Sequence, residues 1–133
     1  VLNCSYNAIS ALVQLPFGAV SGLPAAEQAM RDVLAECLAV ARAEGVRMDL
    51  DAGSQYARIR RTIPGGQYSS MAQDFARGRA TEIAHLNGAI VRRGAALGVA
   101  TPVNQMLVAL IGLVETRMGG EREAAGTREA VAA

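Results

Sequence analysis

The segment over residues 23–46 constrains the fold most, because its apolar residues recur at helical spacing. Pro24 suits the first turn of a helix, where a missing N–H costs nothing, and Gly45 is typical of the residue that ends one. The apolar positions form one stripe: Met30, Val33, Leu34, Cys37, Leu38 and Ala41. A stripe of this kind must pack against a core, so residues 23–44 are predicted to form a long, centrally packed helix.

The rest of the chain repeats this kind of pattern and shows no convincing strand. The breakers "PFGAVSG" and "IPGG" separate successive helical segments, and residues 119–133 are polar and alanine-rich. We therefore predict an all-α helical domain over residues 1–118, followed by a loosely held tail over 119–133. The further helices are expected over residues 1–15, about 50–61, 69–77, 81–98 and 101–118.

Composition narrows the function classes. The chain has 133 residues, 51% of them hydrophobic, so it is long enough for one domain with a sizeable core. Its net charge of +1 favours no nucleic-acid or anionic-membrane partner, and its longest apolar run, residues 106–114, is too short to span a bilayer. Two cysteines do not make a disulfide framework, which indicates a reduced, cytoplasmic protein. A single histidine, His85, makes a metal site improbable.

All thirteen basic residues are arginine. A lysine-based proton donor or Schiff base therefore has to come from outside these 133 residues.

Several polar residues are candidates for a binding site, and each has a structural alternative. Asn3 and Asn7 are four residues apart, so both leave one face of the first helix, where they could bind a ligand carboxylate or bond a neighbouring helix end. Ser69 and Ser70 could cap the short helix that follows them. Glu82, in a predicted first turn, could simply complement a helix dipole. Taken singly, none of these residues assigns a function.

In order, they match a family pattern. The stretch "SSMAQDFARGRATEIAHLNGAIVRRGAALGVATPVNQ" and the helix "LNCSYNAISAL" together resemble the C-terminal domain of the ketopantoate reductase family over residues 1–115. The resemblance implies an all-α bundle similar to the 6-phosphogluconate dehydrogenase C-terminal domain. It also implies that the chain is part of an NADPH-dependent 2-dehydropantoate 2-reductase-like oxidoreductase, which reduces ketopantoate or a related 2-keto acid to the 2-hydroxy acid.

The resemblance further implies a partner domain outside this chain. An N-terminal Rossmann domain would bind most of the NADPH, and no Gly-x-Gly-x-x-Gly fingerprint follows a strand here. The family's catalytic lysine stands four residues before the position of Asn3, which places it ahead of Val1. We therefore expect the fragment alone to be inactive.

Residue roles follow from the resemblance position by position. Asn3 and Asn7 would bind the polar groups of the substrate, and Ser70 would bind its carboxylate. Glu82 would lie at the junction of cofactor and substrate, where it would act in catalysis and orient the nicotinamide. Neutral donors suit this task, because they fix the pose of the substrate without neutralising the lysine.

Two positions depart from the family pattern. Phe17 and Gln67 each stand where the family usually has an asparagine on the substrate side. They leave the reaction type intact and place ketopantoate itself in question. The alternatives are a related β-hydroxyacid dehydrogenase with another substrate, and a non-catalytic helical interaction or dimerisation domain.

The segment "QMLVALIGLV", residues 105–114, is apolar around nearly the whole circumference of a helix. It is therefore either a central core helix or a helix with one side on the domain and the other on a second subunit or the cofactor domain. A homodimer is the partner that this pattern and the resemblance suggest. Complete burial of Leu107, Leu110, Ile111 and Val114 within one chain would exclude that contact.

Overall fold

The computed structural model describes residues 2–47 and 51–132, with side chains over residues 3–47 and 51–121. Within this part of the chain every regular element is an α-helix, which confirms the predicted all-α class. The helices are α1 (Leu2–Val13), α2 (Phe17–Ser21), α3 (Pro24–Ala43), α4 (Ala52–Thr62), α5 (Ser70–Ala76), α6 (Asn87–Leu97) and α7 (Pro102–Ala132).

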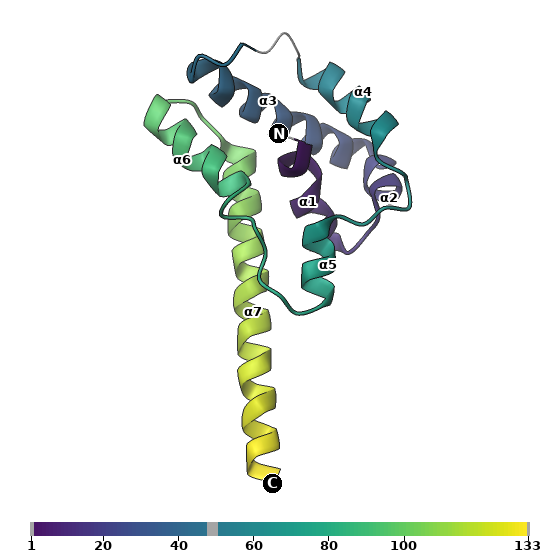
Figure 1. Cartoon of the computed structure of the whole chain (residues 1–133), viewed down its shortest axis with the longest axis vertical. Helices are drawn as coiled ribbons and strands as arrows, with labels where there is room; N and C mark the ends of the chain where they lie inside the picture. The colour runs from purple at the N-terminus through teal and green to yellow at the C-terminus, as the bar shows by residue number, and fades with distance from the viewer. Residues whose placement is uncertain (1, 48–50, 133) are drawn as a thin grey trace.

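Helix α1 lies in the middle of the bundle. It contacts α2, α3, α5 and α7, and α3 in turn contacts α4, α6 and α7 (Figure 1). The predicted stripe of α3 is buried except for Ala41, which is half-buried, and Pro24 begins the helix as expected. Thus α3 and the first half of α7 both pack in the core, as their patterns predict.

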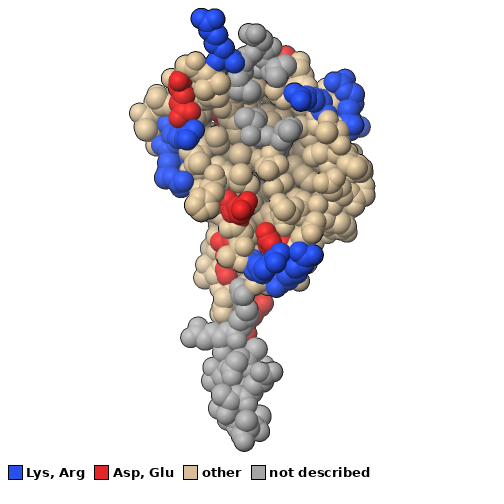
Figure 2. Space-filling view, viewed as in Figure 1, with Lys and Arg blue, Asp and Glu red and all other residues tan. Residues whose placement is uncertain are grey.

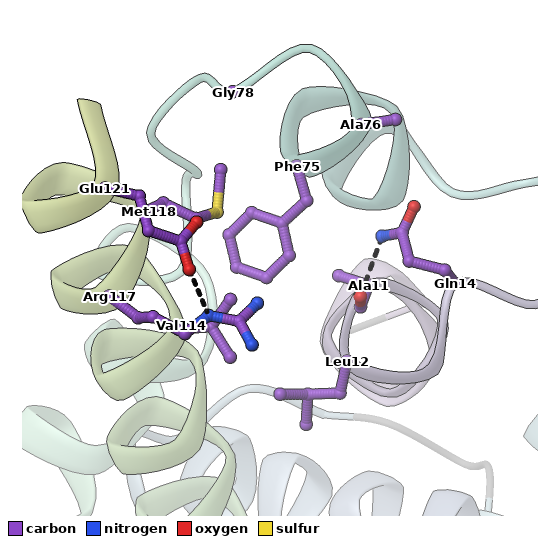
Figure 3. Close-up of a pocket in the computed structure, with 10 residues that line it drawn as sticks. All are labelled: Ala11, Leu12, Gln14, Phe75, Ala76, Gly78, Val114, Arg117, Met118 and Glu121. Carbon is purple, nitrogen blue, oxygen red and sulfur yellow. Dashed lines mark hydrogen bonds and ion pairs between the residues drawn. The ribbon is translucent and has the colours of Figure 1, made fainter. Parts of the chain in front are cut away.

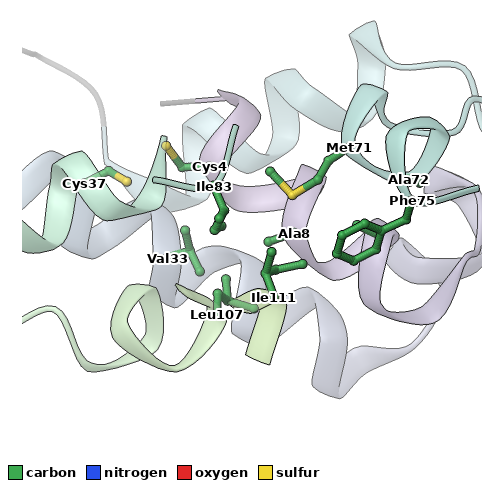
Figure 4. Close-up of a cluster of buried hydrophobic side chains, with 11 residues drawn as sticks. Cys4, Ala8, Val33, Cys37, Met71, Ala72, Phe75, Ile83, Leu107 and Ile111 are labelled. Atoms are coloured by element: carbon green, nitrogen blue, oxygen red, sulfur yellow. The ribbon is translucent and has the colours of Figure 1, made fainter. Parts of the chain in front are cut away.

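Two clusters of buried side chains share α1 and α3. The larger one joins α1, α3, α5, Ile83 and α7 (Figure 4). The smaller one joins α1 to α3 with α2 and α4, and in it the rings of Tyr6 and Phe17 meet edge to face at 5.0 Å. Because α1 contributes to both clusters, its position relative to the other helices is set by packing on several sides.

Three predicted boundaries differ from the structure. The break "PFGAVSG" contains the short helix α2. Helix α6 begins at Asn87, because Thr81 donates its N–H and hydroxyl to Glu115 of α7 and residues 82–86 form turns. Helix α7 was expected to end near Met118 but continues to Ala132 and extends away from the bundle (Figure 1). Alanine, glutamate and arginine after Gly119 and Gly120 are strong helix formers, which accounts for the continuation.

Other boundaries have side-chain or glycine caps, and of these Gly98 and Ser69 were predicted. Asp51 begins α4 by accepting the N–H of Ser54, and Gly98 ends α6 in the left-handed conformation, at φ 68°. Ser69 caps α5, which ends before Arg77 as expected. Residues 48–50, where the α4 prediction began, lie outside the described part of the chain.

Candidate functional site

Helices α1 and α5 bring two of the predicted site residues together. The side chain of Asn7 is 6% exposed, and its Nδ2 donates to Oγ of Ser70 at 3.4 Å. Ser70 is the first residue of α5 and is exposed. The long, single hydrogen bond leaves the hydroxyl of Ser70 with spare donor and acceptor capacity toward solvent.

The neighbouring Ser69 has a different role. It is 3% exposed, accepts the N–H of Ala72 at 3.0 Å and donates its hydroxyl to the carbonyl of Asn7 at 3.2 Å. Ser69 is therefore the N-cap of α5 and ties that helix to α1. The capping alternative thus applies to Ser69, and Ser70 remains available for a ligand.

The other two predicted residues are exposed. Asn3 lies one turn before Asn7 on α1, so the two amides share a face of the helix, as the spacing predicts. Glu82 lies in the turns between α5 and α6. Among the described residues no hydrogen bond or ion pair joins Glu82 to Asn3, Asn7 or Ser70. We call Asn3, Asn7 and Ser70 the open cluster.

The two departures from the family pattern lie beside α1 in different settings. Phe17 is 2% exposed and packs on Tyr6 in the core, so its ring offers almost no surface to a ligand. Gln67 is exposed, and its carbonyl accepts both the hydroxyl of Tyr6, at 2.5 Å, and the N–H of Phe17, at 2.9 Å. A cavity of about 320 Å³ is lined by Gln67, Tyr68 and residues of α5.

Two free, buried thiols lie near each other, Cys4 in the first turn of α1 and Cys37 in α3 (Figure 4). A hydrogen bond from Cys37 lowers the pKa of Cys4. The same contact, together with burial, raises the pKa of the Cys37 thiol. The two residues therefore form a thiol pair between α1 and α3, with any thiolate character on Cys4.

A second polar group, which the sequence analysis assigned no role, lies where α3, α6 and α7 meet. The carboxylate of Glu36 in α3 accepts the N–H groups of Val103 and Asn104, at 2.8 and 2.9 Å, and the side-chain Nδ2 of Asn104, at 2.6 Å. The side chain of Asn87 donates to Asn104 Oδ1 at 2.9 Å and to the carbonyl of Cys4 at 3.0 Å. We call Glu36, Asn87 and Asn104 the amide node. The signal for it in the sequence was the start of α7 at Thr101-Pro102, which needs an acceptor for its first N–H groups.

A larger pocket, about 520 Å³, lies at the other end of α1 and α5 (Figure 3). Its walls combine apolar side chains with Gln14, Arg117 and Glu121, and Arg117 and Glu121 on α7 form an ion pair at 3.7 Å. None of Asn3, Asn7, Ser70 and Glu82 lines it. The pocket is therefore separate from the open cluster.

Charged side chains do not dominate the visible face of the bundle. In Figure 2 the arginines and carboxylates that are described lie mainly around its edge, and uncharged residues fill the centre. Among the described residues no helix is long and apolar enough to cross a membrane, and no cluster of His, Cys, Asp or Glu could hold a metal ion.

The all-helical fold and the family match together define a class, the helical domains of the 6-phosphogluconate dehydrogenase C-terminal type. Within that class, residues 1–115 match the family model described as ketopantoate reductase PanE/ApbA C terminal, and the chain belongs to this family. The resemblance inferred from "LNCSYNAISAL" and the "SSM…TPVN" stretch is thereby confirmed.

Relatives and solved structures agree with this assignment. The chain is 46% identical over 110 residues to a 2-dehydropantoate 2-reductase of Caulobacter vibrioides, covering 83% of the chain and 37% of that protein. It superposes on a crystal structure of a PanE/ApbA family ketopantoate reductase from Ralstonia eutropha with a TM-score of 0.81 and 52% identity, covering 89% of this chain and 39% of the other. A structure of D-mandelate dehydrogenase with NADH and anilino(oxo)acetate gives a TM-score of 0.82 at 27% identity, covering 89% and 39%.

The chain thus spans little more than a third of the length of these relatives. Any activity that needs the remaining two thirds belongs to a longer protein.

Proposed function

We propose that this chain is the substrate-binding domain of a 2-dehydropantoate 2-reductase-like enzyme, which reduces a 2-keto acid to the 2-hydroxy acid with NADPH. The observation that carries the proposal is the pairing of the buried amide of Asn7 with the exposed Ser70, in a chain that belongs to the ketopantoate reductase family. The family names the reaction, and the geometry supplies neutral donors suited to a small carboxylate.

In this proposal the open cluster holds the substrate. Ser70 donates a hydrogen bond to the carboxylate of the substrate, while Asn3 and Asn7 bind the hydroxyl and carbonyl groups of the substrate. Neutral amides and hydroxyls orient these groups without adding a charge, so the pose is fixed while a nearby cation keeps its effect on the reacting carbonyl. The cation is the lysine that the family places four residues before the position of Asn3, one helical turn earlier.

When bound, the cofactor would supply a hydride to the carbonyl carbon, and the lysine expected outside this chain would give a proton to the developing alkoxide. The Rossmann domain expected outside this chain would bind most of the cofactor. From this chain Glu82 is proposed to act on the cofactor side, by orienting the nicotinamide end and the lysine. Its exposed carboxylate fits a residue whose partners lie beyond the chain.

The proposed substrate is a 2-keto acid, and the chemical identity of its side chain is not assigned. Phe17 turns into the core, so its presence gives little support to a more apolar substrate than ketopantoate. Gln67 is exposed near the open cluster and remains a candidate for contact with the substrate side chain. The NADH-bound D-mandelate dehydrogenase keeps NADH and an aromatic 2-keto acid among the alternatives.

The test is steady-state reduction by the full-length protein, with ketopantoate and phenylglyoxylate as substrates and NADPH and NADH as cofactors. We expect turnover of at least one 2-keto acid and a preference for NADPH. Failure to reduce any 2-keto acid with either cofactor would favour the alternative of a non-catalytic helical module. Turnover of phenylglyoxylate alone would favour a related dehydrogenase with another substrate.

We also propose that the enzyme forms a homodimer through α7, in a cytoplasm where its two thiols stay unpaired. Leu107 and Ile111 are buried within the chain, whereas Met106, Leu110 and Leu113 are exposed by 60%, 39% and 66% along one stripe. The condition that would have excluded a second contact, complete burial of the helix, is therefore not met. A second copy would cover the stripe.

Leu113→Asp should convert the full-length dimer to a monomer in sedimentation and leave its thermal stability at high dilution unchanged. The matched control is Val46→Asp, because Val46 is 49% exposed, follows the C-terminal end of α3 and lies outside the stripe. A wild-type protein that sediments as a monomer at all concentrations would contradict the dimer.

We likewise propose residues 119–133 as a polar extension beyond the domain proper, which proteolysis near Gly119 would reveal.

A further inference from the structure

The orientation of both amides in the node is dictated by charge. The carboxylate of Glu36 can only accept, so Asn104 must present Nδ2 to it and Oδ1 to Asn87. Asn87 must then present its own Nδ2, which bridges Asn104 Oδ1 and the carbonyl of Cys4. The carboxylate of Glu36 orients the amide of Asn104, and Asn104 in turn orients the amide of Asn87. A single carboxylate on α3 thus fixes which atom of Asn87 faces α1.

The bridge leaves one buried acceptor without a donor. Asn87 is fully buried, and its Oδ1 has no hydrogen-bond partner among the described residues. An unpaired buried amide oxygen costs stability, and an apolar side chain of similar size would avoid that cost. The value of Asn87 therefore lies in what its Nδ2 does, which is to connect α1 with α7.

The hydrogen bond to Cys4 is not needed to satisfy the backbone of α1. Cys4 lies in the first turn of a twelve-residue helix, and helical geometry already gives its carbonyl a donor four residues later. The bond from Asn87 is an additional contact that reaches across 83 residues of sequence. Such a contact fixes the position of the first turn of α1 relative to α6, and it is not needed to pair the backbone groups of α1.

We propose, building on the proposed function, that Asn87 is a positioning residue of the reductase site. By holding the carbonyl of Cys4, it sets the axial position and rotation of the first turn of α1. That turn carries Asn3, and the family's lysine would stand one turn before it. Asn7 and Ser70 are held separately, because Ser69 ties α5 to the carbonyl of Asn7.

This division predicts a specific kinetic signature. Loss of the Asn87 bridge should displace the lysine side of the site and leave the carboxylate side in place. Displacement of a reacting group by about 1 Å can cost 10²-fold in rate. A smaller displacement of the lysine should therefore lower kcat about 10-fold. The substrate KM should stay within about threefold, because Ser70 and Asn7 keep their geometry.

The test uses the full-length protein with Asn87→Leu, which removes the donor at similar volume, and Asn87→Ser, which leaves room for a bridging water. The matched control is Thr101→Val at the edge of the node. Thr101 is 1% exposed, and its Oγ1 has no partner among the described residues, so valine removes no hydrogen bond there. For each variant we would measure kcat, KM, thermal stability and hydrogen exchange of the first turn of α1.

We expect N87L to lower kcat about 10-fold with little change in KM and to speed amide exchange in the first turn of α1. N87S should fall between N87L and wild type. T101V should match wild type in kcat, KM and exchange, and it should be at least as stable, because it removes an unpaired buried hydroxyl. Lower stability with unchanged kcat, or a raised KM with unchanged kcat, would overturn the proposal, as would failure of both Asn87 variants to fold.

If the wild type reduces no 2-keto acid, the proposed function fails independently. The exchange measurement then decides whether Asn87 positions α1. Unchanged exchange of the first turn in a folded N87L protein would overturn that part.

Discussion

The open cluster and the amide node both contain buried asparagine side chains, yet they are bonded in opposite ways. In the node, Glu36 accepts three hydrogen bonds of 2.6 to 2.9 Å, and Asn87 and Asn104 are fully buried. In the open cluster, Asn7 makes one hydrogen bond of 3.4 Å to a serine that is exposed. Short, charge-assisted bonds hold helices in place, whereas a long bond at the surface can be exchanged for one to a ligand.

The difference separates residues that share one family motif. Asn87 and Asn104 occur in "LNG" and "TPVN", and Ser69 and Ser70 occur in "SSM", all within the same stretch of sequence. The structure divides them into those that fix α1, α5 and α7 and those that face solvent. A motif therefore identifies a site as a unit, and only the contacts show which members are available to bind a substrate.

The largest expected effect comes from breaking the node at its charge. Glu36→Ala would leave the N–H groups of Val103 and Asn104 and the side chain of Asn104 without their acceptor. We expect a loss of about 3 kcal/mol in the free energy of unfolding, measured in urea. Glu36→Gln keeps one acceptor oxygen and should lose about half as much. A Glu36→Ala protein as stable as wild type would show that the node does not hold α7.

Crowding the node by volume should have the next largest effect. A Cβ at Gly94 would lie 2.8 Å from Cγ2 of Thr101 and from the carbonyl oxygen of Val99. Gly94→Ala should therefore cost about 2 kcal/mol in the free energy of unfolding, despite the better helix propensity of alanine. The control is Gly112→Ala in α7, where a Cβ meets no described atom within 4 Å. That substitution should stabilise the protein by about 0.5 to 1 kcal/mol, and equal effects at the two positions would contradict the packing argument.

The adjacent serines test the comparison within one dipeptide. Ser69→Ala removes the N-cap of α5 and its hydrogen bond to the carbonyl of Asn7, and should lower stability by about 1 kcal/mol with a smaller rise in the substrate KM than Ser70→Ala. Ser70→Ala should leave stability nearly unchanged and raise the KM about 10-fold, the loss expected for one hydrogen bond to a charged carboxylate. Thermal unfolding and steady-state kinetics of the full-length protein measure both effects. The reverse result would mean that Ser69, not Ser70, faces the substrate.

Much of the fold could be predicted because its signals are local. Helix α3 follows from its apolar stripe with Pro24, and α5 from a serine at its start. The errors arise where a distant partner decides. Thr81 looks like a helix start, but its hydroxyl and N–H bond Glu115, 34 residues away, so α6 begins later. Glu36 looks like a solvent-facing residue of α3, yet it caps α7 from 67 residues away.

The site follows the same rule. The spacing of Asn3 and Asn7 predicts a shared helix face, which the structure has, and the family pattern adds Ser70. Sequence alone could not show that Phe17 turns inward, because its contact with Tyr6 depends on the path of "PFG" back over α1. The role of Glu82 depends on groups outside the chain and stays a prediction.

The smallest effect is expected at a partly exposed ion pair that belongs to neither region and gives a reference magnitude for both. Glu27 lies 2.7 Å from Arg31 on the next turn of α3, and the guanidinium of Arg31 covers the ring of Tyr56 at 4.6 Å. The hydrogen bond from Arg31 lowers the pKa of Glu27 below its ordinary value.

A carboxyl with a lowered folded-state pKa stabilises the protein above its unfolded pKa of about 4.3, and that contribution is lost as pH falls through the folded value. Glu27→Gln should therefore be slightly less stable than wild type at neutral pH, with the difference vanishing as the pH falls through the lowered folded-state pKa of Glu27. High salt should reduce the difference at neutral pH, because the partly exposed pair is screened. Urea unfolding at several pH values measures this, and a difference that stays constant with pH and salt would show that the pair acts through packing on Tyr56 and not through charge.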